Sequence, residues 1–208
     1  MSRTRIKICG LTRPEDVDAA VDAGADAIGL VFYPPSPRFV APDLAEQLAR
    51  RVPPFVSVVG LFVNAEEAFV RDVLAQVPLN VLQFHGDESE RQCARFGRPW
   101  IKAARVRPGF DLLEFASLHR LAGGILLDAF SAAYGGSGHR FDWSLIPPEM
   151  NRKRLILSGG LDADNVGEAV RRIRPWAVDV SSGVEHNKGI KSAARIAAFI
   201  AGVRNADG

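Results

Sequence analysis

Short apolar runs rich in β-branched residues alternate along the chain with segments whose apolar residues recur every three or four positions. This alternation limits the fold more than any other feature, because strands joined by helices must pair in parallel. The runs that predict strands are residues 5–9, 26–32, 55–63, 80–84, 99–105, 123–128, 153–158 and 176–181. The segments that predict helices are residues 14–23, 42–51, 65–76, 88–96, 110–119, a short one near 143–146, 162–173 and 190–202.

Eight such units in 208 residues predict an α/β fold made of a single (β/α)8 barrel, with one domain over residues 1–208. The alternative is an open, doubly wound sheet, which carries a Gly-x-Gly-x-x-Gly turn after its first strand. Here that turn reads Cys-Gly-Leu-Thr-Arg at 9–13 and lacks the glycine pattern. We therefore prefer the barrel.

Several predicted helices begin at residues that favour a helix start. Asp87 precedes the segment 88–96, and Asp162 precedes Ala163 and the rest of the helix that ends at 173. Pro14 and Pro42 stand in the first turn of their helices, where proline is tolerated.

Composition excludes several classes of protein. With 47% hydrophobic and 24% charged residues the chain is no disordered protein. The net charge is only +2, and the closest arginine groups are Arg50–Arg51 and Arg171–Arg172, so we expect no nucleic-acid partner. The apolar runs fall short of the roughly 20 residues that span a bilayer, and the first residues lack the apolar core of a signal peptide, so we expect no membrane association.

The chain has two cysteines, Cys9 and Cys93, too few for a disulfide framework. Both are expected to be reduced thiols, which is typical of a cytoplasmic protein. Cys93 lies in the middle of a predicted helix and is interpreted as a packing residue.

Polar residues end several of the predicted strands, and the carboxyl ends of the strands carry the active site in barrels of this kind. Lys7 and Cys9 are two residues apart and share the inner face of the first strand, while Ile6 and Ile8 face the helices. A buried lysine needs a partner. Its ammonium would also lower the pKa of the neighbouring Cys9 thiol and favour the thiolate.

Asp128 closes the apolar strand 123–128, and Gln83 and His85 stand at the end of 80–84. A carboxyl group at a strand end suits a general acid or base, and burial there favours its protonated form. The alternative for Asp128 is a structural cap for the loop that follows.

Two glycine turns follow the last two strands and predict a phosphate site. Leu-Ser-Gly-Gly-Leu-Asp contains Gly159 and Gly160, and Val-Ser-Ser-Gly-Val-Glu contains Ser181, Ser182 and Gly183. Barrels often bind phosphate at this position through backbone N–H groups, which glycine allows an anion to approach closely.

Two loops have further features. Arg38 ends the proline-rich loop 33–38, which would hold the guanidinium in place for a carboxylate. The loop 131–138 is rich in glycine and is interpreted as a mobile flap or as a plain flexible loop. No spacing of histidine and cysteine is typical of a metal site, so no metal is expected.

A series of short motifs occurs in the order in which one enzyme family carries them. They are Lys7–Thr12, Ser36–Arg38, Gln83–Gly86, Leu127–Asp128, Gly135–Gly138, Phe141–Trp143, Leu157–Leu161 and Asp179–Glu185. On these motifs the sequence resembles the phosphoribosylanthranilate isomerase family of tryptophan biosynthesis from about residue 5 to 200. The family usually has Asp where Ser192 stands here.

The resemblance implies an Amadori rearrangement of N-(5-phosphoribosyl)anthranilate without a cofactor. It implies Asp128 as general acid, Cys9 as general base, and Arg38 as the residue that holds the anthranilate carboxylate. Lys7, Gln83 and His85 would contact the substrate as well, and the two glycine turns would hold its phosphate. The expected partner is this small phosphorylated molecule, and the expected assembly is a monomer or a homodimer.

Two other interpretations of a phosphate-binding barrel require different residues. Indoleglycerol-phosphate synthase, a related phosphate-binding barrel, would carry a catalytic lysine and glutamate at its strand ends. An inactive, regulatory barrel that binds phosphorylated metabolites would not need Cys9, Asp128 and Arg38 together.

Overall fold

The computed structural model describes residues 3–129 and 142–208, and within them parallel strands close into a barrel. The strands are β1 (Arg5–Cys9), β2 (Ala27–Val31), β3 (Ser57–Phe62), β4 (Val81–Phe84), β5 (Trp100–Val106), β6 (Gly124–Ala129), β7 (Leu155–Leu157) and β8 (Ala177–Val180). They pair in chain order, and β8 returns to pair with β1. The predicted fold class is confirmed.

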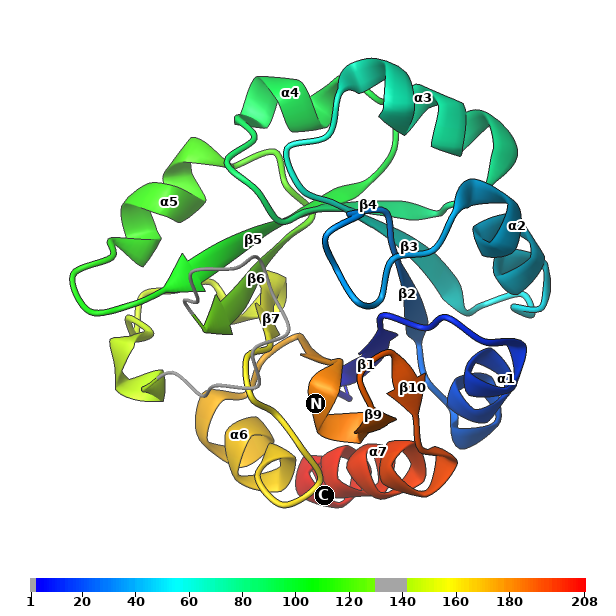
Figure 1. Cartoon of the computed structure of the whole chain (residues 1–208). Helices are drawn as coiled ribbons and strands as arrows, with labels where there is room; N and C mark the ends of the chain where they lie inside the picture. The colour runs from blue at the N-terminus through cyan, green and yellow to red at the C-terminus, as the bar shows by residue number, and fades with distance from the viewer. Residues whose placement is uncertain (1–2, 130–141) are drawn as a thin grey trace.

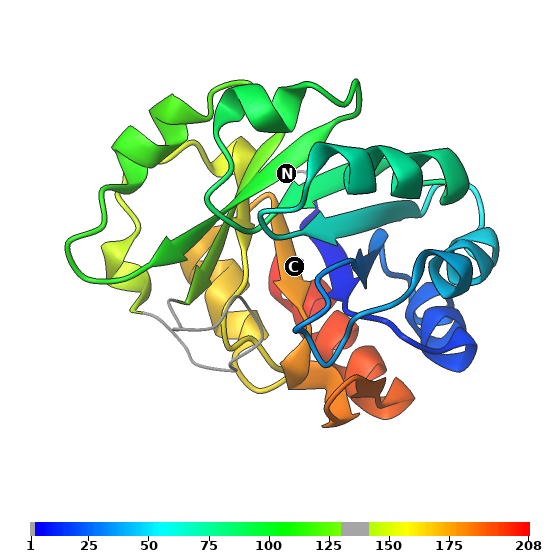
Figure 2. The ribbon, with the colours of Figure 1, turned by 45° about the horizontal axis from the view of Figure 1, so that its top comes forward.

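The helices form a ring around the strands, as Figures 1 and 2 show. They are α1 (Pro14–Ala23), α2 (Pro42–Arg50), α3 (Glu67–Gln76), α4 (Glu90–Ala94), α5 (Leu112–Leu118), α6 (Val166–Ile173) and α7 (Ala193–Asp207). Three 3-10 turns, η1 (Trp143–Leu145), η2 (Arg152–Arg154) and η3 (Ser182–Val184), and the hairpin of β9 (Glu185–Asn187) and β10 (Ile190–Lys191) complete the described elements. Among the described helices, none is long and apolar enough to span a membrane.

Alternation along each strand divides the apolar residues between two cores. Ile6 and Ile8 face outward and join the large core between the barrel and the helices, together with Val17 and Ala20 of α1. The inner face forms a separate apolar cluster in the barrel, made of Val59, Ile101, Ala103, Leu126, Ile156 and Ala177. This inner cluster is the floor on which the polar residues at the strand ends rest.

The end of the chain differs from the prediction. Residues 190–191 are strand β10, paired antiparallel with β9, rather than the start of a helix. Helix α7 begins after Ser192, whose Oγ accepts a hydrogen bond from the backbone N–H of Arg195 at 3.4 Å, and it continues to Asp207. Serine is a favoured N-cap residue, which explains why α7 begins at this position.

Two predicted helix starts are also wrong. The carboxylate of Asp162 accepts the backbone N–H groups of Asp164 and Asn165, both at 3.0 Å, and this turn delays α6 until Val166. Helix α4 starts after Ser89, not after Asp87, because Ser89 and Gln92 form a reciprocal capping box.

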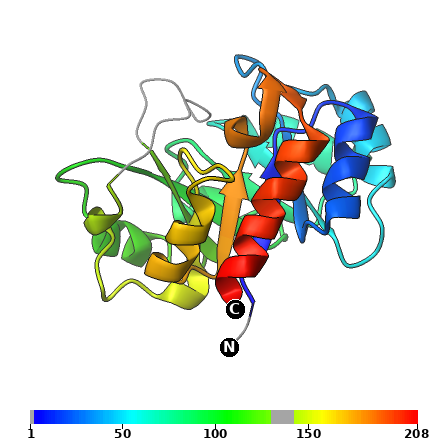
Figure 3. The ribbon, with the colours of Figure 1, turned by 90° about the horizontal axis from the view of Figure 1, so that it is seen from below.

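The two ends of the chain meet at the amino ends of the strands. The backbone N–H of Thr4 donates to Oδ2 of Asp207 at 2.8 Å, and its hydroxyl donates to Oδ1 at 2.7 Å. Figure 3 shows the start of β1 and the end of α7 at this end of the barrel and the β9–β10 hairpin at the other. The hairpin therefore lies at the carboxyl ends of the strands, where the sequence predicts the site.

Candidate active site

A pocket opens at the carboxyl ends of the strands and gathers most of the predicted site residues. Those that line it are Cys9, Arg38, Gln83, His85, Asp128, Gly159, Gly160, Ser181 and Ser182. Lys7 and Gly183 are not part of the lining. Lys7 precedes Cys9 on the inner face of β1 and lies deeper in the barrel. The predicted flap at 131–138 lies outside the described residues.

Cys9 ends β1 and is 4% exposed. Burial raises the pKa of its thiol, and the ammonium of Lys7 lowers that pKa without offsetting burial. The expectation that Lys7 makes the thiolate the favoured form is therefore wrong for the ligand-free protein. Space for the sulfur comes from Gly29 on β2, where a Cβ would lie 2.7 Å from Sγ.

Cys93, the other cysteine, is fully buried in α4 as part of the outer core. Its interpretation as a packing residue is confirmed. Burial raises the pKa of the Cys93 thiol to about 12, which keeps it protonated.

Lys7 has the partner that a buried lysine requires. Its Nζ donates to Oδ1 of Asp179 on β8 at 2.8 Å and to Oε1 of Gln83 on β4 at 2.9 Å. Burial is the largest single influence on Lys7 and opposes its charge, but the interactions with Asp179 and Cys9 together outweigh burial, and the pKa of Lys7 is raised. Asp179 also accepts a hydrogen bond from the hydroxyl of Ser158 at 3.2 Å. These groups form a polar layer between the apolar floor and the pocket.

Asp128 and His85 face each other in the pocket. Nε2 of His85 lies 3.2 Å from Oδ2 of Asp128, and the backbone N–H of Ala129 donates to Oδ1 at 2.9 Å. Gly159 of the β7–α6 turn packs against the same carboxyl group, since a Cβ on it would lie 3.1 Å from Oδ1. Asp128 is 8% exposed and borders the pocket, so its carboxyl group can reach a ligand.

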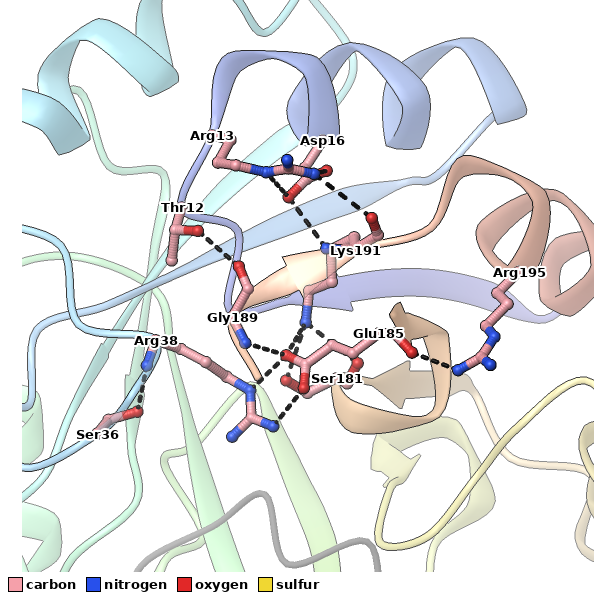
Figure 4. Close-up of polar contacts among 10 residues, drawn as sticks. All are labelled: Thr12, Arg13, Asp16, Ser36, Arg38, Ser181, Glu185, Gly189, Lys191 and Arg195. Atoms are coloured by element: carbon pink, nitrogen blue, oxygen red, sulfur yellow. Dashed lines mark hydrogen bonds and ion pairs between the residues drawn. The ribbon is translucent and has the colours of Figure 1, made fainter. Parts of the chain in front are cut away.

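Arg38 already holds a carboxylate of the protein itself. Its Nε and Nη2 donate to Oε1 and Oε2 of Glu185, each at 2.7 Å, and Lys191 Nζ donates to Oε1 at 2.9 Å (Figure 4). Burial opposes the charge on Glu185, yet the two cations lower its pKa. The Nη1 atom of Arg38 points away from Glu185 in Figure 4. The end formed by Nη1 and Nη2 is therefore the edge that a substrate carboxylate could use.

The hairpin that carries Glu185 and Lys191 is fastened to its neighbours by further hydrogen bonds (Figure 4). Lys191 donates its backbone N–H to Asp16 of α1 at 3.1 Å and its ammonium to the Ser181 carbonyl at 3.1 Å. Thr12 donates to the Gly189 carbonyl at 2.6 Å, and Arg195 donates to the Glu185 carbonyl. Arg38 is thereby positioned by a rigid element rather than by its own loop alone.

The two predicted phosphate turns lie side by side. Gly159 and Gly160 have φ of +75° and +66°, a conformation that favours glycine. A Cβ on Gly183 would lie 1.9 Å from the Leu161 carbonyl, so glycine is required for the turns to pack together. The backbone N–H groups of these glycines and of Ser182 donate to no group among the described residues. They can receive an anion.

Several residues of the site escape the sequence argument. Asp179 stands on the inner face of its strand, an acid within an apolar run, and that signal could have found it. Glu185 and Lys191 carry no such signal, because the sequence predicts a loop and the start of a helix where the β9–β10 hairpin forms. Among the described residues, no group of histidine, cysteine and carboxylate side chains could hold a metal ion.

Comparison with known proteins finds the same family by sequence and by structure. A family model described as N-(5′-phosphoribosyl)anthranilate (PRA) isomerase matches residues 6–202. The N-(5′-phosphoribosyl)anthranilate isomerase of Dechloromonas aromatica (strain RCB) is 65% identical over 205 residues, which cover 99% of this chain and 98% of that protein.

Two solved structures resemble the barrel closely. One is a phosphoribosyl anthranilate isomerase in complex with reduced 1-(o-carboxyphenylamino)-1-deoxyribulose 5-phosphate, with a TM-score of 0.85 and 42% identity over 97% of this chain and 99% of that one. The other describes monomers of the dimeric phosphoribosylanthranilate isomerase from Thermotoga maritima, with a TM-score of 0.85 and 40% identity over the same shares.

Proposed function

The chain belongs to the N-(5′-phosphoribosyl)anthranilate isomerase family, and we propose that Cys9 and Asp128 are the base and the acid of its reaction. The enzyme acts in tryptophan biosynthesis and converts the aminoaldose N-(5′-phosphoribosyl)anthranilate into 1-(2-carboxyphenylamino)-1-deoxyribulose 5-phosphate by an Amadori rearrangement. The observation that carries the proposal is a single pocket lined by Cys9, Asp128, Arg38 and both glycine turns. Steady-state turnover of this aminoaldose by the purified chain and its variants tests it.

The first step opens the furanose ring. The carboxyl group of Asp128 gives its proton to the ring oxygen, the bond between C1′ and that oxygen breaks, and the nitrogen lone pair forms the C1′=N bond of a protonated Schiff base. The resulting carboxylate faces Nε2 of His85 and accepts a hydrogen bond from the backbone N–H of Ala129, which stabilises its charge.

The second step moves a proton from C2′ to Cys9. The thiolate takes this proton, the C–H electron pair becomes the C1′=C2′ bond, and the iminium nitrogen is neutralised. Burial disfavours the thiolate in the free protein, but the positive Schiff base would favour it at the moment when it is needed. The Cys9 thiol then gives its proton to C1′ and the C2′ hydroxyl gives its proton to the Asp128 carboxylate, so the ketone forms and both groups regain their starting states.

We propose that the backbone of Gly159, Gly160, Ser182 and Gly183 holds the phosphate, with Ser181 beside them in the lining. Ser182→Asp should then raise KM by about 10²-fold, since a like charge about 5 Å away costs a few kcal/mol at an effective dielectric constant near 20. Ser182→Asn is the matched control of equal size, and its KM should stay within a few-fold of the wild type. If inorganic phosphate inhibits Ser182→Asp as strongly as it inhibits the wild type, the anion binds elsewhere.

Arg38 is proposed to hold the anthranilate carboxylate with its Nη1–Nη2 edge. Arg38→Lys should raise KM about 10- to 100-fold, because charge-assisted hydrogen bonds contribute about 1.5–3 kcal/mol and an ammonium lacks the planar fork that offers one edge to Glu185 and another to the substrate. The check is inhibition by the reduced product analogue and by its counterpart without the carboxyl group. Arg38→Lys should weaken inhibition by the analogue with the carboxyl group and leave inhibition by the other compound unchanged. Equal weakening of both would mean that Arg38 only supports the structure of the site.

We further propose that the whole chain, residues 1–208, acts as one domain, as a monomer or a homodimer. The rearrangement moves protons and an electron pair within one molecule, so we propose that it needs no cofactor or metal. Two reduced, buried thiols fit a cytoplasmic location. We propose that the protein binds neither nucleic acid nor membrane.

A further inference from the structure

A continuous row of hydrogen bonds crosses the barrel from Lys7 on β1 to Asp128 on β6. Lys7 Nζ lies 2.9 Å from Gln83 Oε1, Gln83 Nε2 lies 3.1 Å from His85 Nδ1, and His85 Nε2 lies 3.2 Å from Asp128 Oδ2. All four side chains are buried. The reaction proposed above uses only the last of them directly.

The direction of the row is set at Lys7. An ammonium group can only donate, so the amide of Gln83 must turn its oxygen toward Lys7. The opposite orientation would place the NH2 group against the ammonium. Asp179, the other acceptor of Lys7, holds the ammonium in place at 2.8 Å and keeps it charged. The NH2 group of Gln83 is therefore left to face His85.

The orientation of Gln83 in turn selects the tautomer of His85. The NH2 group can only donate, so Nδ1 of His85 must offer its lone pair. A proton on Nδ1 would oppose the NH2 group, which disfavours the Nδ1–H tautomer. The neutral ring of His85 then carries its proton on Nε2, the atom that faces Asp128.

We propose that Lys7 and Gln83 are positioning residues that hold His85 as the Nε2–H tautomer, so that the acidic proton of Asp128 can pass only to the substrate. The proposal rests on the acid role of Asp128 proposed above. With Nε2 already protonated, His85 cannot take the proton of Asp128. Once the proton has gone to the ring oxygen, the same N–H stabilises the carboxylate.

The reversed tautomer would defeat this arrangement. With the proton on Nδ1, the bare Nε2 would accept the proton of Asp128 as a hydrogen bond and draw it away from the pocket. The acid is then lost, although the pocket keeps its shape.

Gln83→Glu tests the proposal with almost no change in size. Both oxygens of a glutamate accept, so the variant keeps its contact with Lys7 but requires a proton on Nδ1 of His85. We expect kcat to fall by about 10²-fold, the lower end for one proton-transfer group, with KM within about threefold of the wild type. Gln83→Met is the control: it removes both contacts of the amide but imposes no tautomer, and it should lose less activity than Gln83→Glu.

The tautomer is read directly by ¹⁵N NMR of the ligand-free protein, with the His85 signals assigned by their loss in His85→Asn. We expect a bare Nδ1 and a protonated Nε2 in the wild type, and a protonated Nδ1 in Gln83→Glu. A protonated Nδ1 in the wild type would overturn the proposal without any variant. A Gln83→Met variant that loses as much activity as Gln83→Glu would also overturn it. Such a loss is expected if Gln83 has only a structural role, because methionine removes both contacts of the amide. Neither result bears on the role of Asp128 as the acid, which the Asp128→Asn variant tests separately.

Discussion

Cys9→Ala is expected to lower kcat by about 10²–10⁴-fold while KM stays nearly unchanged. The substitution removes the base proposed for the C2′ proton. It leaves in place Arg38 and the glycine turns, which are proposed to bind the two charged ends of the substrate. Steady-state kinetics over a range of substrate concentrations separates the two constants.

Two control variants sharpen this result. Cys9→Ser keeps the size of the side chain but offers a hydroxyl that is far less acidic than a thiol, so it should also fail. Cys93→Ala alters the other buried thiol, which lies in α4 away from the pocket, and should keep its kcat. A wild-type kcat in Cys9→Ala would remove Cys9 from the mechanism.

Asp128→Asn is expected to lower kcat by a similar factor and to change the shape of the pH–rate profile. The amide cannot deliver a proton, so the ionisation of Cys9 alone should govern the remaining activity. A base works when deprotonated, and burial raises the pKa of Cys9. The residual rate should therefore rise with pH beyond the usual thiol range and then level off, without the fall at high pH that loss of the acid proton gives the wild type.

Stability of the Asp128 variant must be measured alongside. His85 and Ala129 contact different oxygens of Asp128, and in the amide an NH2 group replaces one of them, so one buried donor is left unpaired at a cost of about 1–3 kcal/mol. We expect a lower melting temperature but a folded barrel by circular dichroism. A fall at high pH that persists in this folded variant would assign the acid role to another residue.

The sequence allowed the fold and much of the site to be predicted because both depend on local periods. Alternation along a strand places Lys7 and Cys9 on the same face, and parallel strands place their carboxyl ends at the same rim. The pocket lining of Cys9 and Asp128 follows from those two rules. Their chemical roles came from the resemblance and stay a proposal.

What the sequence could not predict depends on contacts between distant segments. Glu185 occupies Arg38 across 147 residues, and nothing in either segment indicates the pair. The net pKa shift of Cys9 is a balance between burial and the charge of Lys7, and only the three-dimensional structure weighs the two. Helix α6 starts only at Val166 because the Asp162 carboxylate accepts a hydrogen bond within the preceding turn instead of capping a helix.

The most direct test of the roles of Cys9 and Asp128 is the kinetic isotope effect with substrate deuterated at C2′. Each variant should slow its own step: in Cys9→Ser, removal of the C2′ proton becomes rate-limiting, so the isotope effect on the residual kcat should be large and primary. In Asp128→Asn, ring opening precedes that removal and becomes rate-limiting, so the effect should be close to unity. A primary effect in Asp128→Asn with none in Cys9→Ser would contradict the assignment of Cys9 as base and Asp128 as acid.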